Sequence, residues 1–173
     1  MAAPSLEAAR PAILRLSFAP DPSSAREASL AVRNFLAEQG VAERELFPYE
    51  LCAAEAVNNA VEYAVGRSRG LRPVAEVLLT AEHVEMRVTD HTPGFDLADR
   101  VAPPPMDGVR GRGLFLIQSI MDEVRYLRGS DENTLVMRKR LAAENSPDAL
   151  SGRAARPRPA PAAPPSWHFT VVD

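Results

Sequence analysis

The order in which hydrophobic periodicity changes along this chain of 173 residues limits its fold more than any other feature. Apolar residues alternate with polar ones in a first segment, recur at helical spacing in two segments, and alternate again in two more. A long loop, a third helical segment and two further alternating segments follow. Because the helices are grouped, this order predicts an α+β two-layer sandwich, with helices on one face of a mixed, mainly antiparallel sheet. It disfavours a doubly wound parallel sheet.

The bounds of the expected elements follow from the periods and from capping and turn residues. Capping side chains at 21–24 begin the first helix and Gly40 ends it, whereas Gly66 ends the second. The expected strands cover residues 13–18, 74–80, 84–89, 123–127 and 134–138, and the expected helices cover residues 21–40, 43–65 and 113–121.

Proline divides the chain into a core and a tail, because 6 of its 16 prolines fall between residues 147 and 165. The sequence therefore predicts a mobile N-terminus at 1–11, a single domain at 12–142 and a disordered Pro/Ala-rich tail at 143–173. The tail ends in an apolar peptide around Trp167. A loose terminus, a strand that completes the sheet and a strand added to a partner's sheet edge are alternatives for this peptide.

Composition excludes several classes of function. A net charge of -3, from 20 basic and 23 acidic residues, argues against direct binding of nucleic acid. The one lysine, Lys139, is not in a Walker phosphate loop, and the one cysteine, Cys52, excludes an internal disulfide or a cysteine-cluster zinc site. We recognise neither a secretion signal nor an apolar stretch of membrane-spanning length, so we expect a cytoplasmic protein without membrane contact.

One apparent catalytic motif has the wrong context. Residues 66–70 match the Gly-x-Ser-x-Gly nucleophile elbow, which needs a strand before it and a helix after it. Here the segment follows a helix and precedes a strand. It is better interpreted as the exit from the second helix.

The second helix carries an unusual polar stripe. Glu55 and Asn59 are one turn apart on one face, and Asn58 precedes Asn59 although asparagine disfavours helix interiors. A face turned to solvent explains such a stripe. The functional alternative makes Asn59 an oxygen ligand of Mg²⁺ and Glu55 a base that accepts a hydroxyl proton.

Two further segments have the composition of ligand-binding loops. Asp90 ends a strand and leads into Pro93-Gly94, where it either aims into a cleft or merely caps a turn. Gly111 and Gly113 precede an apolar helix, whose free backbone N–H groups favour anions. Arg110 and Arg112 add positive charge there.

In this order, the three segments resemble the N, G1 and G2 boxes of the GHKL (histidine kinase-like) ATPases. Glu55-x-x-x-Asn59 is similar to the N box, Asp90 to Gly94 to the G1 box, and residues 111–114 to the G2 box. The resemblance covers residues 12–140 and is strongest to the anti-sigma factor serine/threonine kinases of bacterial partner-switching systems. It implies a Bergerat-type sandwich that uses ATP and Mg²⁺.

The resemblance also implies a role for each matching residue. Glu55 would be the general base, Asn59 the magnesium ligand and Asp90 the residue that binds the adenine amino group. The remaining implied nucleotide-binding residues are Gly94, which shapes the adenine pocket, Arg110, Gly111, Arg112, Gly113 and Leu114 at the triphosphate, and Thr134 on the adenine side.

The implied function is phosphorylation of a serine on an anti-sigma antagonist of the STAS type, together with sequestration of a sigma factor, by a homodimeric kinase. Arg26 and Arg33, on the polar side of the first helix, are a candidate partner surface, with a plain solvated face as the alternative. Two positions depart from the family pattern: Thr92 replaces a glycine of the G1 box, and Tyr63 replaces a frequent histidine. An ATP-binding module that works only by sequestration, or a client other than a sigma factor, therefore remain alternatives.

Overall fold

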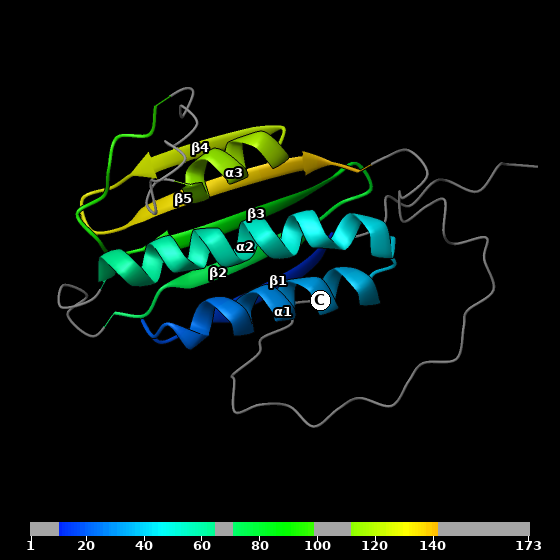
Figure 1. Cartoon of the computed structure of the whole chain (residues 1–173), viewed down its shortest axis with the longest axis horizontal. Coiled ribbons are helices and arrows are strands. Elements are labelled where there is room, and N and C mark those ends of the chain that lie inside the picture. Colours follow the sequence, from blue (N-terminus) through cyan, green and yellow to red (C-terminus); the bar gives the residue numbers. More distant parts are fainter. Residues whose placement is uncertain (1–10, 65–70, 99–111, 142–173) are drawn as a thin grey trace, which may run out of the picture.

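The computed structural model describes residues 11–64, 71–98 and 112–141 (Figure 1). The predictions about the N-terminus and the tail, the segment 66–70, Arg110 and Gly111 lie outside these residues, and the proposed domain bounds stay a prediction. The elements in chain order are β1 (Ala12–Ser17), α1 (Ser23–Glu38), α2 (Glu43–Ala64), β2 (Val74–Leu79), β3 (His83–Asp90), α3 (Arg112–Ile120), β4 (Glu123–Arg128) and β5 (Asn133–Arg140).

The strands form one five-stranded sheet in the order β1-β2-β3-β5-β4. Every neighbouring pair is antiparallel, so the described strands include no parallel pair. Figure 1 shows α1, α2 and α3 together in front of the sheet. The predicted α+β sandwich is confirmed. Among the described elements, no helix is long and apolar enough to cross a bilayer.

The core lies between the helices and one face of the sheet. Alternate residues of β2, namely Ala75, Val77 and Leu79, are buried there, whereas the residues between them are only half-buried. Leu36 of α1 and Val57 of α2 are completely buried against the same face. Burial of these apolar side chains is the main force that holds the helical layer on the sheet.

On the other face of the sheet, Glu85 of β3 is only 2% exposed and is held by two arginines. Its Oε1 accepts a hydrogen bond from Arg87 Nε at 2.7 Å, and its Oε2 accepts one from Arg138 Nε at 3.0 Å. Burial alone would raise the pKa of the Glu85 carboxyl, but the two guanidinium groups hold this pKa below its usual value. The carboxylate is therefore charged and paired.

The single lysine, Lys139, has a structural role at the end of α3. Lys139 Nζ donates a hydrogen bond to the carbonyl oxygen of Ile120, the last residue of α3, at 2.9 Å. Positive charge is favoured at the carboxyl end of a helix, where the last carbonyl groups lack intrahelical partners. Lys139 therefore stabilises the end of α3 rather than the glycine-bearing start.

Three strands, β3, β4 and β5, are longer than the sequence predicts, and the difference at β3 and β5 affects the site. β3 includes Asp90, and β5 begins at Asn133 rather than at Thr134. Their antiparallel register places Asp90 directly opposite Asn133. Thus Asp90 is fixed in a strand pair rather than in a free loop.

Candidate functional site

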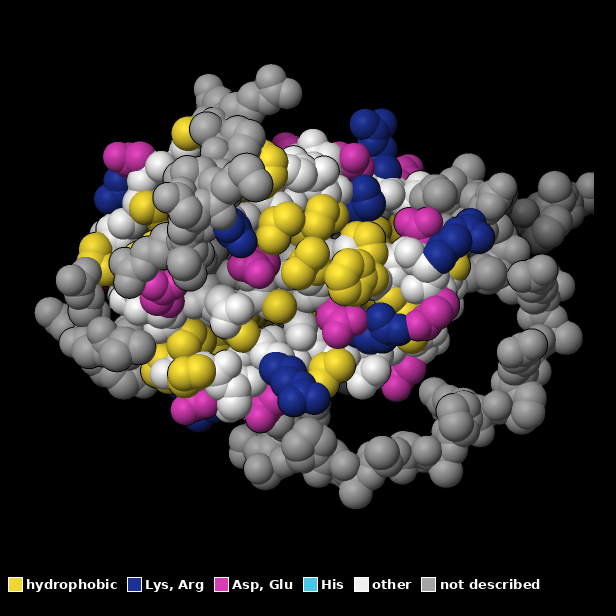
Figure 2. Space-filling model, viewed as in Figure 1, with side chains coloured by type: hydrophobic (Ala, Val, Ile, Leu, Met, Phe, Trp, Pro, Cys, Tyr) yellow, Lys and Arg dark blue, Asp and Glu magenta, His cyan; other side chains and the backbone are white. Residues whose placement is uncertain are grey.

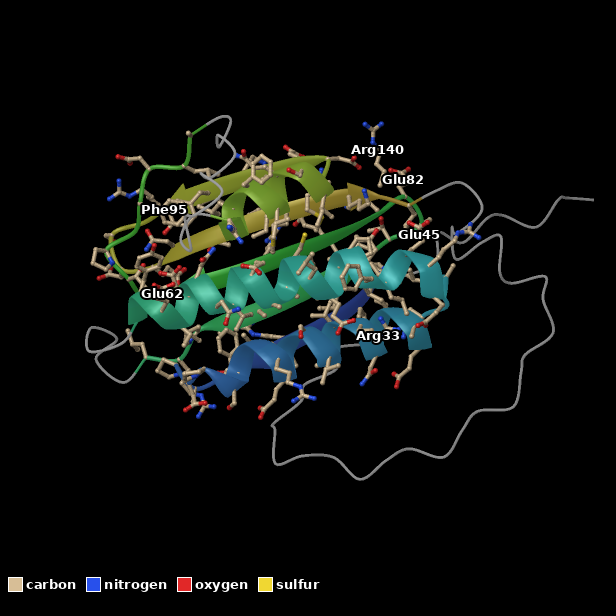
Figure 3. All side chains as sticks on the ribbon, viewed as in Figure 1. Arg33, Glu45, Glu62, Glu82, Phe95 and Arg140 are labelled. Carbon is tan, nitrogen blue, oxygen red and sulfur yellow. The ribbon has the colours of Figure 1, made fainter. Side chains whose placement is uncertain are left out.

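Three elements bring the polar residues of the candidate site to one end of the molecule. α2 and β3 both run toward this end, and α3 begins there and runs back antiparallel to α2 (Figure 1). α2 packs against both β3 and α3. Figure 3 shows Glu62, near the end of α2, and Phe95, after β3, at this end, whereas Glu45 lies at the opposite end of α2. The three resembling segments therefore meet, as far as they are described.

Glu55 lies against the start of α3. A Cβ atom placed on Gly113 would be 2.6 Å from Glu55 Oε2, closer than atoms of this kind approach. The absence of a side chain at Gly113 thus allows the carboxylate to reach the first turn of the helix. At this end of α3 the backbone N–H groups lack intrahelical acceptors and attract anions. A half-buried carboxylate is therefore held beside a potential phosphate-binding turn.

Asn59 follows Glu55 by one helical turn and is half-buried, whereas its neighbour Asn58 is exposed. The Asn59 side-chain nitrogen is buried and has no hydrogen-bond partner among the described residues. An unsatisfied buried polar group costs about 1–3 kcal/mol, so the environment of this carboxamide fits a site that a ligand completes. Its oxygen is the kind of ligand that Mg²⁺ prefers.

Asp90 is 7% exposed at the end of β3, and one of its oxygens is held by the protein. Asp90 Oδ1 accepts a hydrogen bond from the backbone N–H of Thr92 at 2.9 Å and a longer one from Asn133 Nδ2 at 3.4 Å. Asn133 Nδ2 also donates to the Thr92 carbonyl oxygen at 2.8 Å. These bonds tie the start of the loop to β5.

The loop then turns at Gly94, whose φ of +75° favours glycine. A Cβ at this position would be 2.9 Å from Asn133 Oδ1 and 3.2 Å from Arg128 Nε. The Thr92 hydroxyl accepts a hydrogen bond from the Gly94 N–H at 3.2 Å. The threonine that departs from the family pattern is therefore used in the turn, where its hydroxyl supports the loop.

Thr134 lies elsewhere. Side chains alternate along β5, so Thr134 is on the sheet face opposite to that of Asn133 and Asp90. Its hydroxyl is 2.9 Å from that of Thr89 on the same face. The structure does not bring Thr134 to the other site residues, and its implied adenine-side role stays a prediction without support from its position.

Asn133 is the site residue that sequence reasoning missed. The predicted strand starts at Thr134 and omits Asn133, yet Asn133 is 3% exposed, bonds to Asp90 and Thr92, and lies where a side chain at Gly94 would be. One signal was available, because a residue directly beside an alternating apolar run can be the first residue of the strand. Its register could not be read from the sequence.

The remaining expected nucleotide-binding residues belong to α3. Arg112 is its exposed first residue, and Leu114 is half-buried against the core. Arg112 thus places positive charge at the start of α3, as expected. Among the described residues, no group of three or more His, Cys, Asp or Glu side chains could hold a metal ion.

Behind the Asp90 loop, Phe95 stacks on Tyr126 of β4, with ring centroids 4.1 Å apart and an angle of 25° between the planes. Burial, and secondarily the negative charge of Asp90, raise the pKa of Tyr126 to about 12, so it stays a neutral phenol. A cavity of about 500 Å³ opens between this pair, Gln118 and Arg128. It includes neither Glu55 nor Asn59, so we assign the candidate site by side-chain chemistry rather than by this cavity.

The cysteine of α2, Cys52, cannot act as a nucleophile. Cys52 is completely buried, and burial raises the pKa of its thiol to about 12. A thiol of this kind carries almost no thiolate at neutral pH. Glu55 and Asn59 are therefore the side chains of α2 that could take part in chemistry at the site.

The fold and the site define an α+β ATPase-like sandwich in which a carboxylate of α2 lies beside the glycine-bearing start of α3, with a carboxamide one turn further along α2. The family model of the histidine kinase-like ATPase domain matches residues 18–139. The chain belongs to this family.

Relatives of the chain include bacterial serine-protein kinases. The serine-protein kinase RsbW of Listeria monocytogenes serovar 1/2a is 31% identical over an alignment of 105 residues, and the match covers 52% of this chain and 67% of the relative. The serine-protein kinase RsbW of Oceanobacillus iheyensis is 28% identical over 124 residues, covering 63% of this chain and 77% of the relative.

A solved structure has the same fold. The structure of the RsbU and RsbW domains of Rv1364c from Mycobacterium tuberculosis matches with a TM-score of 0.56 and 21% identity. The match covers 74% of this chain but only 32% of that chain. At this identity the similarity supports the fold of the domain and nothing beyond it.

Proposed function

We propose that this protein is an ATP- and Mg²⁺-dependent serine/threonine protein kinase that acts as an anti-sigma factor or related partner-switching regulator. It phosphorylates a serine of a STAS-type anti-sigma antagonist and sequesters a sigma factor, thereby regulating transcription. The proposal is supported by family membership, by relatives named serine-protein kinase RsbW, and by the site. Its cytoplasmic location and its homodimeric state belong to the same proposal.

The observation that carries the proposal is the position of the Glu55 carboxylate beside Gly113. A protein kinase needs a group that accepts the hydroxyl proton of the substrate, next to donors that bind the transferred phosphoryl group. Glu55 is the former and the first turn of α3 supplies the latter. In the transfer, the serine oxygen forms a bond to the γ-phosphorus, the bond from this phosphorus to ADP breaks, and Glu55 takes the serine proton.

The other residues hold the nucleotide. Asp90 accepts a hydrogen bond from the adenine amino group, Gly94 keeps the pocket open, and Asn59 contributes its carboxamide oxygen to Mg²⁺. When bound, Mg²⁺ neutralises phosphate charge during the transfer. Arg112 and the backbone of Gly113 bind the triphosphate, and Arg110 and Gly111 are proposed to join them.

The helical layer is the proposed partner surface. Figure 2 shows hydrophobic side chains gathered over this layer, with charged side chains around them. Arg33 of α1 bonds to Glu50 Oε2 at 2.9 Å and also pairs with Glu43, so it serves the contact between α1 and α2. Arg26 is exposed on the same helix and has no ion-pair partner in the described part of the chain. We therefore expect Arg26 to be the stronger contact for a partner.

Transfer of radiolabelled phosphate from ATP to a purified, co-encoded antagonist tests the kinase proposal. We expect transfer by the wild type, and a loss of about 100-fold for Glu55→Gln, which keeps the shape but cannot accept a proton. Glu45→Gln, at the opposite end of α2, is the matched control and should transfer phosphate normally. Absence of transfer by the wild type would contradict the proposal.

The alternative is an ATP-binding module that works only by sequestration. It was favoured by Thr92, but the threonine hydroxyl supports the Gly94 turn, so this departure is not evidence against a formed pocket. If the wild type binds ATP and retains a sigma factor but transfers no phosphate, the alternative is correct. Binding of Arg26→Glu and Arg33→Glu to the antagonist would map the surface in either case.

A further inference from the structure

Asn133 is a buried polar residue in a strand, and strand formation alone does not explain it. Asparagine is disfavoured in strands, and a buried polar side chain costs free energy unless it is bonded. Yet Asn133 is only 3% exposed as the first residue of β5. Its side-chain nitrogen bonds to the end of β3 and to the loop that follows, which indicates a specific task there.

The side-chain nitrogen of Asn133 connects two points of this loop. It donates to the Thr92 carbonyl oxygen at 2.8 Å and to Asp90 Oδ1 at 3.4 Å. The Thr92 N–H donates to the same Asp90 oxygen at 2.9 Å. Two donors, one from the loop and one from β5, therefore hold the same oxygen of the Asp90 carboxylate.

This arrangement leaves the two oxygens of Asp90 unequal. Oδ1 is occupied, whereas Oδ2 has no hydrogen-bond partner in the part of the chain that the structure describes. An oriented carboxylate oxygen accepts a hydrogen bond from an exocyclic amino group and repels a carbonyl oxygen at the same place. Adenine carries an amino group at position 6, and hypoxanthine carries a carbonyl oxygen there.

We propose that Asn133 is a positioning residue that sets the purine selectivity of the site, because it holds Asp90 with one oxygen directed at the base. The inference rests on the proposed function, in which Asp90 binds adenine. The oxygen of Asn133 also lies where a side chain at Gly94 would be, so the same residue sets the shape of the loop at the pocket.

Calorimetric titration of the full chain with ATP and with inosine triphosphate, both with Mg²⁺, tests the inference. We expect Asn133→Ala to weaken ATP binding about tenfold, since it removes the side-chain nitrogen that donates to Asp90 and to the Thr92 carbonyl oxygen, with little change for inosine triphosphate. The preference for ATP over inosine triphosphate then falls about tenfold. Thr89→Val is the matched control: it removes a side-chain hydrogen bond from the residue before Asp90, on the other sheet face, and should keep the preference within twofold.

A merely structural role for Asn133 predicts a different result. Partial unfolding weakens both nucleotides by the same factor, so an unchanged preference in a weakened Asn133→Ala protein overturns the inference, as does unchanged ATP affinity. If Asn133→Ala does not fold, Asn133→Asp keeps the side-chain size but replaces the donor with a carboxylate. It should lose the preference at least as completely, and a retained preference overturns the inference.

Asp90→Asn separates this inference from the proposed function. Loss of the preference in Asp90→Asn, but not in the Asn133 variants, contradicts the inference alone. A wild-type protein that binds no ATP contradicts both.

Discussion

Glu55 and Gly113 form a contact that no other residue at position 113 could make without moving the carboxylate, because a Cβ there would be 2.6 Å from Glu55 Oε2. The contact joins α2 to the start of α3. It gives a physical reason for a glycine in the first turn of a helix, where glycine costs at most the about 0.5–1 kcal/mol, relative to alanine, that it costs in the middle of a helix. Glycine at position 113 therefore lowers the stability of the helix but allows the charged Glu55 side chain to lie beside it.

Gly113→Ala should separate stability from activity. The alanine favours the helix, and the atom that it displaces is the end of a flexible side chain, so we expect the free energy of unfolding to change by less than about 1 kcal/mol. Phosphoryl transfer should fall about tenfold or more, because Glu55 is displaced from the phosphate-binding turn. Urea unfolding and the radiolabel assay measure the two effects.

The double variant Glu55→Gln/Gly113→Ala is the control for this prediction. If Gly113 acts through Glu55, adding Gly113→Ala to Glu55→Gln should cause little further loss. Independent, multiplicative losses would show that Gly113 acts on the nucleotide directly.

Asn59→Ala should abolish the magnesium-dependent part of ATP binding. The variant removes the carboxamide oxygen but leaves the helix intact, since alanine is the better helix former. Calorimetry with Mg²⁺ and with a chelator should show a large difference for the wild type and none for Asn59→Ala. Asn58→Ala, at the exposed neighbouring position, is the matched control. Equal effects of the two substitutions would refute the proposed ligand role of Asn59.

Gly94→Ala should destabilise the domain. Its φ of +75° costs a residue with a side chain about 1–2 kcal/mol, and contact with Asn133 Oδ1 adds to this cost. We expect a loss of about 2 kcal/mol or more in urea unfolding. Gly40→Ala, at a φ of 89° after α1, reports the backbone cost away from the site. A smaller loss for Gly94→Ala than for Gly40→Ala would contradict this account of the loop.

Glu85 should make stability depend on pH. Because its folded-state pKa lies below the usual value, its charged form stabilises the fold above the unfolded-state pKa of about 4.3. This contribution is lost as the pH falls through the folded-state pKa. Glu85→Gln should therefore cost about 2 kcal/mol at pH 7 and progressively less below about pH 4.

Glu76→Gln is the reference for that measurement. Its ion pair with Arg15 lies on the same face of the sheet, but the two side chains are 36% and 59% exposed. Exposed pairs contribute less than about 1 kcal/mol, so Glu76→Gln should have a small effect at every pH. Equal pH dependence of the two variants would count against a special role of the buried Glu85.

The sequence predicted the elements because local periodicity and caps are properties of neighbouring residues. Asp21, for example, is expected at the start of the first helix, and its Oδ1 accepts the Ser23 N–H at 2.8 Å in the turn before the helix, although the N-cap residue itself is Pro22, which makes no side-chain cap bond. The predicted bounds of the helices and strands that the structure describes differ from the observed ones by only one or two residues at most ends. Even the single-residue error at β5 mattered, since it hid Asn133.

The fold class, the family and the order of the polar segments could be predicted from the amino-acid sequence. Packing of the folded chain settles which side chains meet: Glu55 reaches Gly113, Asn133 bonds to Asp90, and Thr134 lies on the opposite face of the sheet. The physical reason is that a shift of strand register by one residue exchanges the two faces, while helix contacts depend on packing between segments far apart in the chain. Local sequence patterns predict neither the strand register nor the packing between distant segments.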